Sequence, residues 1–425
     1  MDSKKIIKPN AFTALTAAAA ALPGIAMGAI PAEKMSFSYH ASRYSEGDIP
    51  AGDLVSNDTS GGKRYDIDVH QFAFETPLMT KFQLNIDGAV ESMTGASQKH
   101  NRLEDGKLKV VMSGATISEK RTDVTTSLTR FFDRSTLGGS FGYSKENDYK
   151  SQSLGLNGSF ETNEKLTTYN WAALYSSDKI NPTAATGQTP IYTFESATSH
   201  DSFFRSRVKN AEKKSTSLYA GVLQVINKTS TVEAGINYLH HSGFLSDPYK
   251  EAYIYALPDI SSPTPVAEIV SDRRPDTKTG YALSARYRKF VAEANAALHL
   301  DYRFYHDDWQ VTSHTLSVDW FQNLANGWQV IPGLRWYSQS EAGFYAPYYI
   351  GGRADFLASS DFRLSGYGAV SEQLQVKKQI NDIELYGLIE NYQSGKSYGL
   401  DSSKEENPAL VNFYLVSIGI DYKFK

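Results

Sequence analysis

The stretch Phe413-Tyr-Leu-Val-Ser-Ile-Gly-Ile-Asp-Tyr-Lys-Phe424 decides the fold. In an extended strand, neighbouring side chains point to opposite faces. One face of this stretch is apolar with aromatic ends and carries Tyr414, Val416, Ile418, Ile420, Tyr422 and Phe424. The other face is small and polar and carries Ser417, Gly419 and Asp421. This pattern predicts a strand that has lipid on one side and a water-filled lumen on the other.

Segments with the same alternation recur along the chain, and helical periodicity is scarce. Leu298, Leu300 and Tyr302, for example, alternate with His299, Asp301 and Arg303. The pattern predicts about sixteen strands. They cover residues 35–46, 64–77, 81–94, 118–131, 136–147, 150–162, 166–178, 214–227, 230–243, 277–290, 295–307, 311–323, 328–341, 361–377, 381–395 and 409–424.

The connections between these segments alternate in length. Short, turn-like connections lie at residues 77–80, 133–136, 162–165, 227–230, 325–327 and 378–381, and around Glu293. Long connections lie at residues 95–117, 179–213, 244–276, 342–360 and 396–408. Outer-membrane barrels have short periplasmic turns and long extracellular loops. The sequence therefore predicts an all-β fold, a transmembrane antiparallel up-and-down β-barrel of about sixteen strands.

A soluble β-sandwich or propeller would also show alternating strands. Its strands would usually be shorter, whereas tilted strands of ten or more residues match the thickness of a bilayer. Residues 107–113 are ambiguous, because they fit either a hairpin within a loop or part of a barrel strand. Assigning them to the barrel would change the strand count by a pair.

The N-terminal segment has the parts of an export signal. Lys4, Lys5 and Lys8 precede a short apolar stretch, and small residues follow around Gly28. We expect residues 1–29 to be a signal peptide and residues 30–425 to form the barrel. Phe424 also resembles the aromatic signal by which the barrel-assembly machinery recognises its clients. These features predict export through the periplasm and contact with the lipid of a bacterial outer membrane.

Composition excludes several other classes of protein. The chain has no cysteine, so it cannot form disulfides, thiolate metal sites or a covalent c-type haem attachment. Its formal net charge of −4 is too balanced to suggest nucleic-acid binding.

Charged residues fall on the polar faces of several predicted strands, where we expect them to line the lumen. These candidate lumen-lining residues are Asp87, Glu91, Arg286, Arg288, His299, Asp301, Arg303, Asp319 and Arg335. Opposed acidic and basic groups would select solutes by charge. Alternatively, these groups only neutralise one another inside a closed barrel.

Signals of enzymatic chemistry are weak. His306-Asp307-Asp308 is better explained as a solvated turn than as an acid/base group. His200-Asp201-Ser202, or His314 with Ser317, cannot set the geometry of a triad by adjacency alone. His240 and His241 would point to opposite faces of a strand and cannot chelate together. We therefore assign no catalytic, cofactor-binding or metal-ligating residue, and expect no cofactor and no enzymatic activity.

Several motifs resemble a family of bacterial outer-membrane proteins, domain-of-unknown-function family 3570. They lie at Tyr65–Gln71, Glu91–Ala96, Glu119–Val124, Phe244–Tyr249, Asp272–Pro275, His299–Tyr305, Ser313–Leu316 and Arg335–Ser340. The resemblance implies a Gram-negative outer-membrane barrel. It also implies partners, namely a small lipoprotein, a thioredoxin-like protein and an enzyme that attaches flavin to exported proteins. It supplies no catalytic residues.

Two hypotheses from different classes follow. The first is a porin-like passage for small polar solutes or an exported product. The second is an outer-membrane scaffold that seats flavinylated or haem-containing redox partners. A barrel enzyme is disfavoured.

Overall fold

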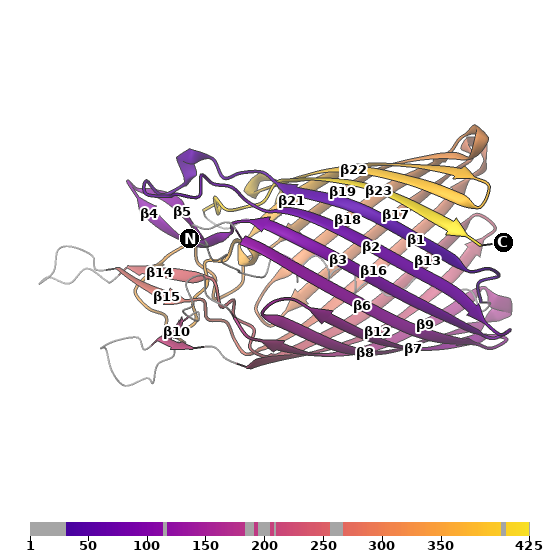
Figure 1. Cartoon of the computed structure of the whole chain (residues 1–425), viewed down its shortest axis with the longest axis horizontal. Coiled ribbons are helices and arrows are strands. Elements are labelled where there is room, and N and C mark those ends of the chain that lie inside the picture. Colours follow the sequence, from indigo (N-terminus) through magenta and orange to yellow (C-terminus); the bar gives the residue numbers. More distant parts are fainter. Residues whose placement is uncertain are drawn as a thin grey trace, which may run out of the picture.

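The computed structural model describes residues 31–113, 117–182, 191–193, 205–207, 210–255, 267–400 and 405–424. Within them, sixteen antiparallel strands form one closed barrel (Figure 1). In ring order they are β1 (Ser36–Glu46), β2 (Asp66–Leu78), β3 (Phe82–Gly95), β6 (Ile117–Phe131), β7 (Ser135–Lys145), β8 (Tyr149–Thr162), β9 (Thr167–Ile180), β12 (Ala211–Asn227), β13 (Ser230–Gly243), β16 (Thr277–Val291), β17 (Ala296–Asp307), β18 (Thr312–Asn323), β19 (Trp328–Gln339), β21 (Tyr367–Ile380), β22 (Ile383–Gly395) and β23 (Phe413–Lys423). The predicted fold class is confirmed. The expected signal peptide lies outside the described residues.

The barrel closes between its first and last strands. β1 pairs with β23 from Ser36 opposite Lys423 to Glu46 opposite Phe413. Along β23 the predicted alternation is observed, since Ile418 is 65% exposed on the outer surface and Ser417 is 6% exposed inside. Every strand of the ring therefore has two partners, which leaves no edge for aggregation.

The outer surface carries an aliphatic band between aromatic residues. Leu154, Ile236 and Ile389 lie in the middle parts of their strands and are exposed. Exposed aromatic side chains include Phe160 and Trp328 near one rim and Tyr281 and Tyr414 near the other. An apolar band flanked by aromatic girdles is the surface that a membrane barrel presents to lipid. No helix among the described residues is long and apolar enough to cross a membrane.

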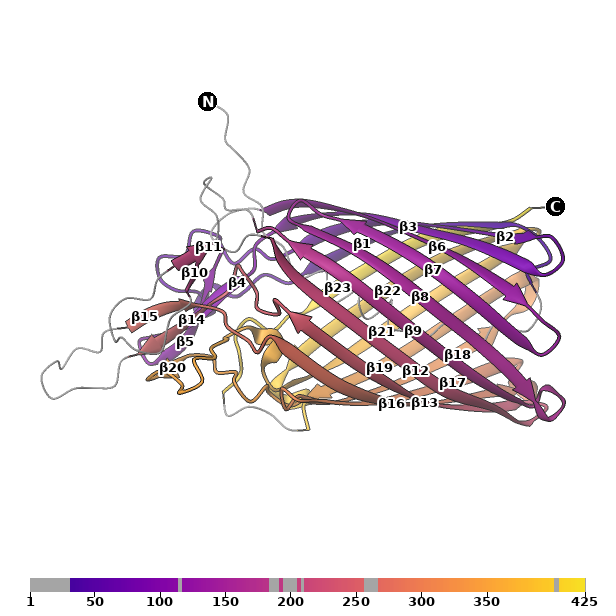
Figure 2. The same cartoon turned by 90° about the horizontal axis from the view of Figure 1, so that it is seen from below.

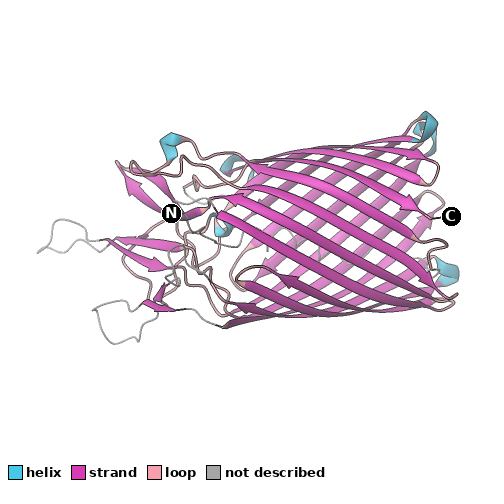
Figure 3. Cartoon of the chain, viewed as in Figure 1, coloured by secondary structure: helices cyan, strands magenta, loops and turns pink. Residues whose placement is uncertain are grey.

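The two rims of the barrel differ, as Figures 1 and 2 show. The rim near the C-terminus has only short turns. Four of them contain an asparagine with positive φ, namely Asn163, Asn295, Asn326 and Asn381. Asparagine tolerates this left-handed conformation, which tight turns require. The short 3-10 helices η2 (Asn163–Lys165), η3 (Ala292–Ala294) and η4 (Ala325–Gly327) also lie in these turns (Figure 3).

The opposite rim carries longer connections that fold into small sheets. β4 (Gln98–Glu104) pairs with β5 (Lys107–Met112), and β10 (Ile191–Thr193) pairs with β11 (Arg205–Arg207). β14 (Glu251–Tyr255) lies between β15 (Ala267–Ser271) and β20 (Tyr349–Ile350). The 3-10 helices η1 (Ala51–Asp53), η5 (Phe362–Leu364) and η6 (Lys396–Tyr398) belong to the same rim. Residues 107–113 thus belong mainly to a hairpin within a loop.

Two predicted strand starts were too early. β21 begins at Tyr367 rather than at residue 361, because residues 361–365 form a capped 3-10 turn. The side chain of Asp361 accepts a hydrogen bond from the backbone N–H of Arg363 there. β23 begins at Phe413 rather than at residue 409, because Ala409 packs in an apolar cluster of loop residues with Ile49 and Val110.

At the long-loop rim, buried apolar side chains of different loops pack together in clusters. One contains Ile49, Leu54, Ala96, Val110, Met112 and Ala409. Another contains Trp309, Val311, Ala342, Phe344, Tyr345 and Leu364, and a third contains Ala252, Val270, Tyr349 and Ala358. These loops therefore have a hydrophobic core of their own. We call residues 47–65, 96–113, 244–255, 267–276, 340–366 and 405–412 the cap.

Candidate functional site

A cavity of about 650 Å³ lies inside the barrel, and side chains from opposite walls line it. Hydroxyl groups dominate the wall formed by β6 to β12, with Thr125, Ser151, Ser153, Ser176, Ser215 and Ser217. The wall formed by β17 to β22 contributes Arg303, Tyr305, Arg335, Tyr337, Tyr367 and Tyr392. Most of the residues that line the cavity therefore carry a hydrogen-bond donor.

Most of the predicted lumen-lining residues have partners inside the barrel. Arg286 pairs with Glu233 at 3.3 Å, and Arg288 pairs with Asp301 at 2.6 Å. Asp319 accepts a hydrogen bond from the side-chain amide of Gln373 at 2.8 Å. Arg286 and Arg288 are thus neutralised by acids of neighbouring strands, whereas Asp319 is hydrogen-bonded to a neutral amide.

The other predicted residues are arranged differently. His299 packs against Phe321, with 4.1 Å between the ring centroids. Glu91 lies 3.8 Å from Arg121 of β6, and Asp87 lies on the same inward face of β3. Within the described parts of the chain, Arg303 and Arg335 have neither an ion pair nor a hydrogen bond. Of the four predicted arginines, Arg286 and Arg288 thus have an acidic partner, and Arg303 and Arg335 have none within the described residues.

The weak catalytic candidates do not assemble. His306 is exposed and contacts Thr312, whereas the adjacent Asp307 is buried and pairs with Lys278 at 2.9 Å. His240 contacts Thr279, and His241 contacts Ser215. The side chains of His240 and His241 therefore contact different neighbouring strands, β16 and β12. Residues 200–202 lie outside the described part of the chain.

The cap crosses the mouth of the barrel. Gln98, which follows β3, donates a hydrogen bond to the carbonyl of Ser360, and Lys250, which follows β13, donates to the carbonyl of Gln98. Lys99 and His100 contact Glu251 at 2.7 and 3.0 Å. β3 and β13 lie six places apart in the ring of sixteen, so these loops meet over the opening.

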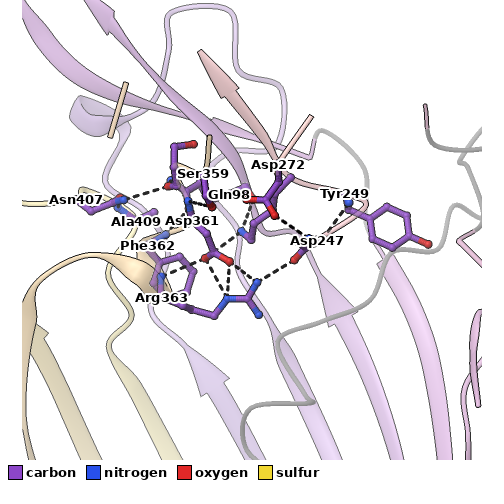
Figure 4. Close-up of polar contacts among 12 residues, drawn as sticks. Gln98, Asp247, Tyr249, Asp272, Ser359, Asp361, Phe362, Arg363, Asn407 and Ala409 are labelled. Carbon is purple, nitrogen blue, oxygen red and sulfur yellow. Dashed lines mark hydrogen bonds and ion pairs between the residues drawn. The ribbon is translucent and has the colours of Figure 1, made fainter. Parts of the chain in front are cut away.

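A buried ion-pair network holds the cap together (Figure 4). Asp361 lies at its centre and pairs with Arg274 at 2.8 Å, with Lys250 at 3.7 Å and with Arg363. Arg274 also pairs with Asp272 at 2.8 Å, and Arg363 pairs with Asp247 at 2.9 Å. We call Asp247, Lys250, Asp272, Arg274, Asp361 and Arg363 the cap network. Its three acids and three bases balance in charge.

Burial and nearby opposite charges shift the pKa values of the cap residues in opposite directions. Burial alone would raise the pKa of Asp361, but Arg363, Lys250 and Arg274 hold it well below its ordinary value. Burial lowers the pKa of Lys250. Burial would likewise raise the pKa of Glu251, but a hydrogen bond from His100 and the charge of Lys99 lower it to about 2. The cap carboxylates Asp361 and Glu251 are therefore ionised at neutral pH.

A second acidic group lies beneath the cap and lacks such a balance. Glu119 of β6 and two residues of the β7–β8 turn, Glu146 and Asp148, bring carboxylate oxygens within 4.8 Å of one another. We call these three residues the acidic cluster. Burial raises the pKa of Glu146 to about 7 and the pKa of Asp148 to about 6. The surrounding protein therefore supplies too little positive charge to balance these three carboxylates.

Sequence reasoning missed both the cap network and the acidic cluster. The cap network joins segments that are far apart in the chain, since the bond between Arg363 and Asp247 spans 116 residues, and the acidic cluster joins β6 to the β7–β8 turn. One signal was present, since Glu119, Asp247 and Asp272 lie in motifs that carry the family resemblance. The structure brings these motifs together at one end of the barrel.

The family model described as "Protein of unknown function (DUF3570)" matches residues 12–408. The chain belongs to this family. The resemblance drawn from the motifs is thereby confirmed. The search of curated proteins gave no match to this DUF3570 protein.

Several solved outer-membrane structures are similar to the DUF3570 barrel. The siderophore receptor PirA from Pseudomonas aeruginosa is 11% identical with a TM-score of 0.39, over 86% of this chain and 57% of the receptor. A bacterial polysaccharide outer membrane secretin is 9% identical with a TM-score of 0.45, over 92% of this chain and 99% of that one. OccK1 (OpdK) from Pseudomonas aeruginosa is 7% identical with a TM-score of 0.38, over 92% and 98%. This chain thus spans little more than half the length of PirA.

Proposed function

We propose that this DUF3570 protein is a capped outer-membrane passage for small polar solutes, with a preference for those that carry negative charge. The proposal rests on two arginines on the wall of the lumen cavity, Arg303 and Arg335. Neither has an ion pair or a hydrogen bond within the described residues. Two cationic side chains without counter-charges on one wall of the lumen attract solutes of negative charge.

The size and chemistry of the cavity support the same proposal. A volume of about 650 Å³ is typical of sites for small molecules. The serine and threonine hydroxyls face the arginines across the lumen and can donate or accept hydrogen bonds. A small solute with an anionic group and several hydroxyl or amide groups would satisfy both walls.

The cap makes the proposed passage a gated one. Its loops are joined over the mouth by the cap network and by three apolar clusters. A solute would enter after part of the cap moves aside. We therefore expect the wild-type protein to have a low conductance that increases when the cap is loosened.

Planar-bilayer recording tests the proposal. The wild-type protein should favour anions, measured as the reversal potential in a salt gradient, and the double variant Arg303→Gln/Arg335→Gln should shift that potential towards cation preference. The matched control is Arg43→Gln, which removes one charge from an exposed side chain on the outer surface. Absence of conductance in the wild type and in cap-loosened variants would refute a passage and leave the scaffold for redox partners.

We also propose the orientation of the chain. The short-turn rim would face the periplasm and the cap would face the exterior, after export and insertion by the barrel-assembly machinery. The difference between the rims and the aromatic end of the last strand support this arrangement. Because the chain has no cysteine, single replacements can be labelled with a membrane-impermeant maleimide. Asp105→Cys should react on intact cells, and Asn326→Cys should not.

A further inference from the structure

A buried carboxylate with no partner points to a further site in this protein. Glu119 is 6% exposed, and neither of its carboxylate oxygens has a hydrogen-bond partner. The backbone N–H of Asn147 lies near this carboxylate but outside hydrogen-bond geometry. An ionised carboxylate that is removed from water needs a counter-charge or several donors, and the surrounding protein supplies neither in full.

The two neighbouring carboxylates make the demand for positive charge stronger. Glu146 is 6% exposed, and its closest cation is Arg121, with 3.8 Å between the nitrogen and oxygen atoms. Asp148 is 2% exposed, and its Oδ1 has no hydrogen-bond partner. Its other oxygen accepts a hydrogen bond from the hydroxyl of Tyr249. Among the described residues, Glu146 is thus the one member of the cluster with a cation within ion-pair distance, and that arginine also pairs with Glu91 and Asp123.

The geometry fits a hard divalent cation. Oxygen ligands of Ca²⁺ lie about 2.3–2.6 Å from the ion, so ligands of one ion lie at most about 5 Å apart. The oxygens of the acidic cluster lie within 4.8 Å of one another. All the ligand atoms of the cluster are carboxylate oxygens, which suit Ca²⁺ or Mg²⁺ rather than softer metals.

We propose that the acidic cluster formed by Glu119, Glu146 and Asp148 is a divalent-cation site, with Ca²⁺ as the preferred ion. The ion joins β6 to the β7–β8 turn. The hydrogen bond between Asp148 and Tyr249 connects this turn to residues 244–255 of the cap. Cation binding therefore strengthens the attachment of the cap to the barrel wall.

The affinity should be modest. Calcium sites of extracellular modules have dissociation constants of about 10⁻⁴–10⁻³ M. About three to five further oxygens, from water or from backbone carbonyls, would complete the usual six to eight ligands. The site would then fill at the millimolar calcium concentrations that surround many bacteria.

Terbium luminescence tests the proposal with the full chain folded in detergent. After treatment with EDTA at pH 7.5, Tb³⁺ should give emission sensitised by the adjacent Tyr149 and Tyr249, and Ca²⁺ should displace it. Glu119→Gln should weaken Tb³⁺ and Ca²⁺ binding at least tenfold. The control is Asp123→Asn, which removes a nearby charge that is not part of the cluster, and it should change the affinity less than threefold.

Thermal unfolding gives a readout that separates a cation site from a merely structural acid. In EDTA, Glu119→Gln should unfold at the same temperature as the wild type or higher, because it removes a buried unpaired charge. In Ca²⁺ the wild type should gain stability and the variant should not. The proposal is wrong if neither Ca²⁺ nor Mg²⁺ at 10 mM raises the unfolding temperature of the wild type. It is equally wrong if Glu119→Gln responds to Ca²⁺ as the wild type does. Glu146→Gln repeats the test should Glu119→Gln fail to fold.

Discussion

Replacement of Asp361 by asparagine should open the cap without unfolding the barrel. Asp361 is 1% exposed and pairs with Lys250, Arg274 and Arg363. Its carboxylate supplies one of the three negative charges that balance these three bases. The asparagine would leave the buried network with one uncompensated positive charge. Removing one partner from a buried ion pair costs about 3–5 kcal/mol.

The loss should appear as faster proteolysis of the cap. A cost of about 4 kcal/mol corresponds to a roughly thousandfold larger population of opened cap. Lys250, Arg274 and Arg363 are trypsin sites that become accessible only on opening. When opening and closing are fast, the rate of cleavage follows this population. We therefore expect limited trypsin digestion to be faster by a factor of about 100 to 1,000.

Two controls make the experiment decisive. Asp355→Asn breaks an ion pair with Arg353 in which both side chains are exposed, so it should cost at most about 1 kcal/mol. An intact barrel should still migrate as the folded band on an unheated SDS gel. If Asp361→Asn is digested no faster than Asp355→Asn, the network does not hold the cap closed.

Three further predictions concern other parts of the molecule. The pKa of Glu251 is lowered from 4.5 to about 2, so its stabilising contact of about 3 kcal/mol is present above pH 4.5 and is lost as the pH falls towards 2. Hydrogen exchange of the cap should show this loss, and Glu251→Gln should reduce the pH dependence by the share of Glu251, leaving that of Asp361. Gly235→Ala places a Cβ 2.6 Å from the ring of Tyr219 and should lower the free energy of unfolding by about 1–3 kcal/mol, whereas Gly387→Ala, which has open space, should not. Ile418→Arg puts a charge near the middle of the lipid-facing surface and should cost about 2–4 kcal/mol in urea unfolding in lipid vesicles.

The barrel was predictable because its information is local. Ile418 and Ser417 are neighbours in the chain, and their opposite character alone fixes which face meets lipid. Asparagine-containing turns mark where strands end. The late starts of β21 and β23 show the limit of this reasoning, because an apolar residue such as Ala409 gives the same signal in a loop core as on a lipid-facing strand.

The candidate site was only partly predictable because its chemistry depends on pairing between strands. The alternation of polar and apolar residues predicted that Arg286 and Arg303 both face the lumen. It could not show that Glu233 neutralises Arg286 while Arg303 lacks an ion pair within the described chain. That difference depends on which residue of the neighbouring strand lies opposite, and hence on the register. The cap depends on even longer connections, between loops that follow strands on different sides of the barrel.

The cap network and the acidic cluster differ in how their charges are balanced, and this difference supports different roles for them. In the cap network every acid lies beside a base of the same protein, so the closed cap is complete without a ligand. In the acidic cluster Glu119 has no such base, although it is equally removed from water. Burying ionised carboxylates without compensation destabilises the fold. A protein that balances its charges in the cap network but not in the adjacent cluster must obtain the missing positive charge for that cluster from protons or from a bound cation, and the oxygen geometry of Glu119, Glu146 and Asp148 favours the cation.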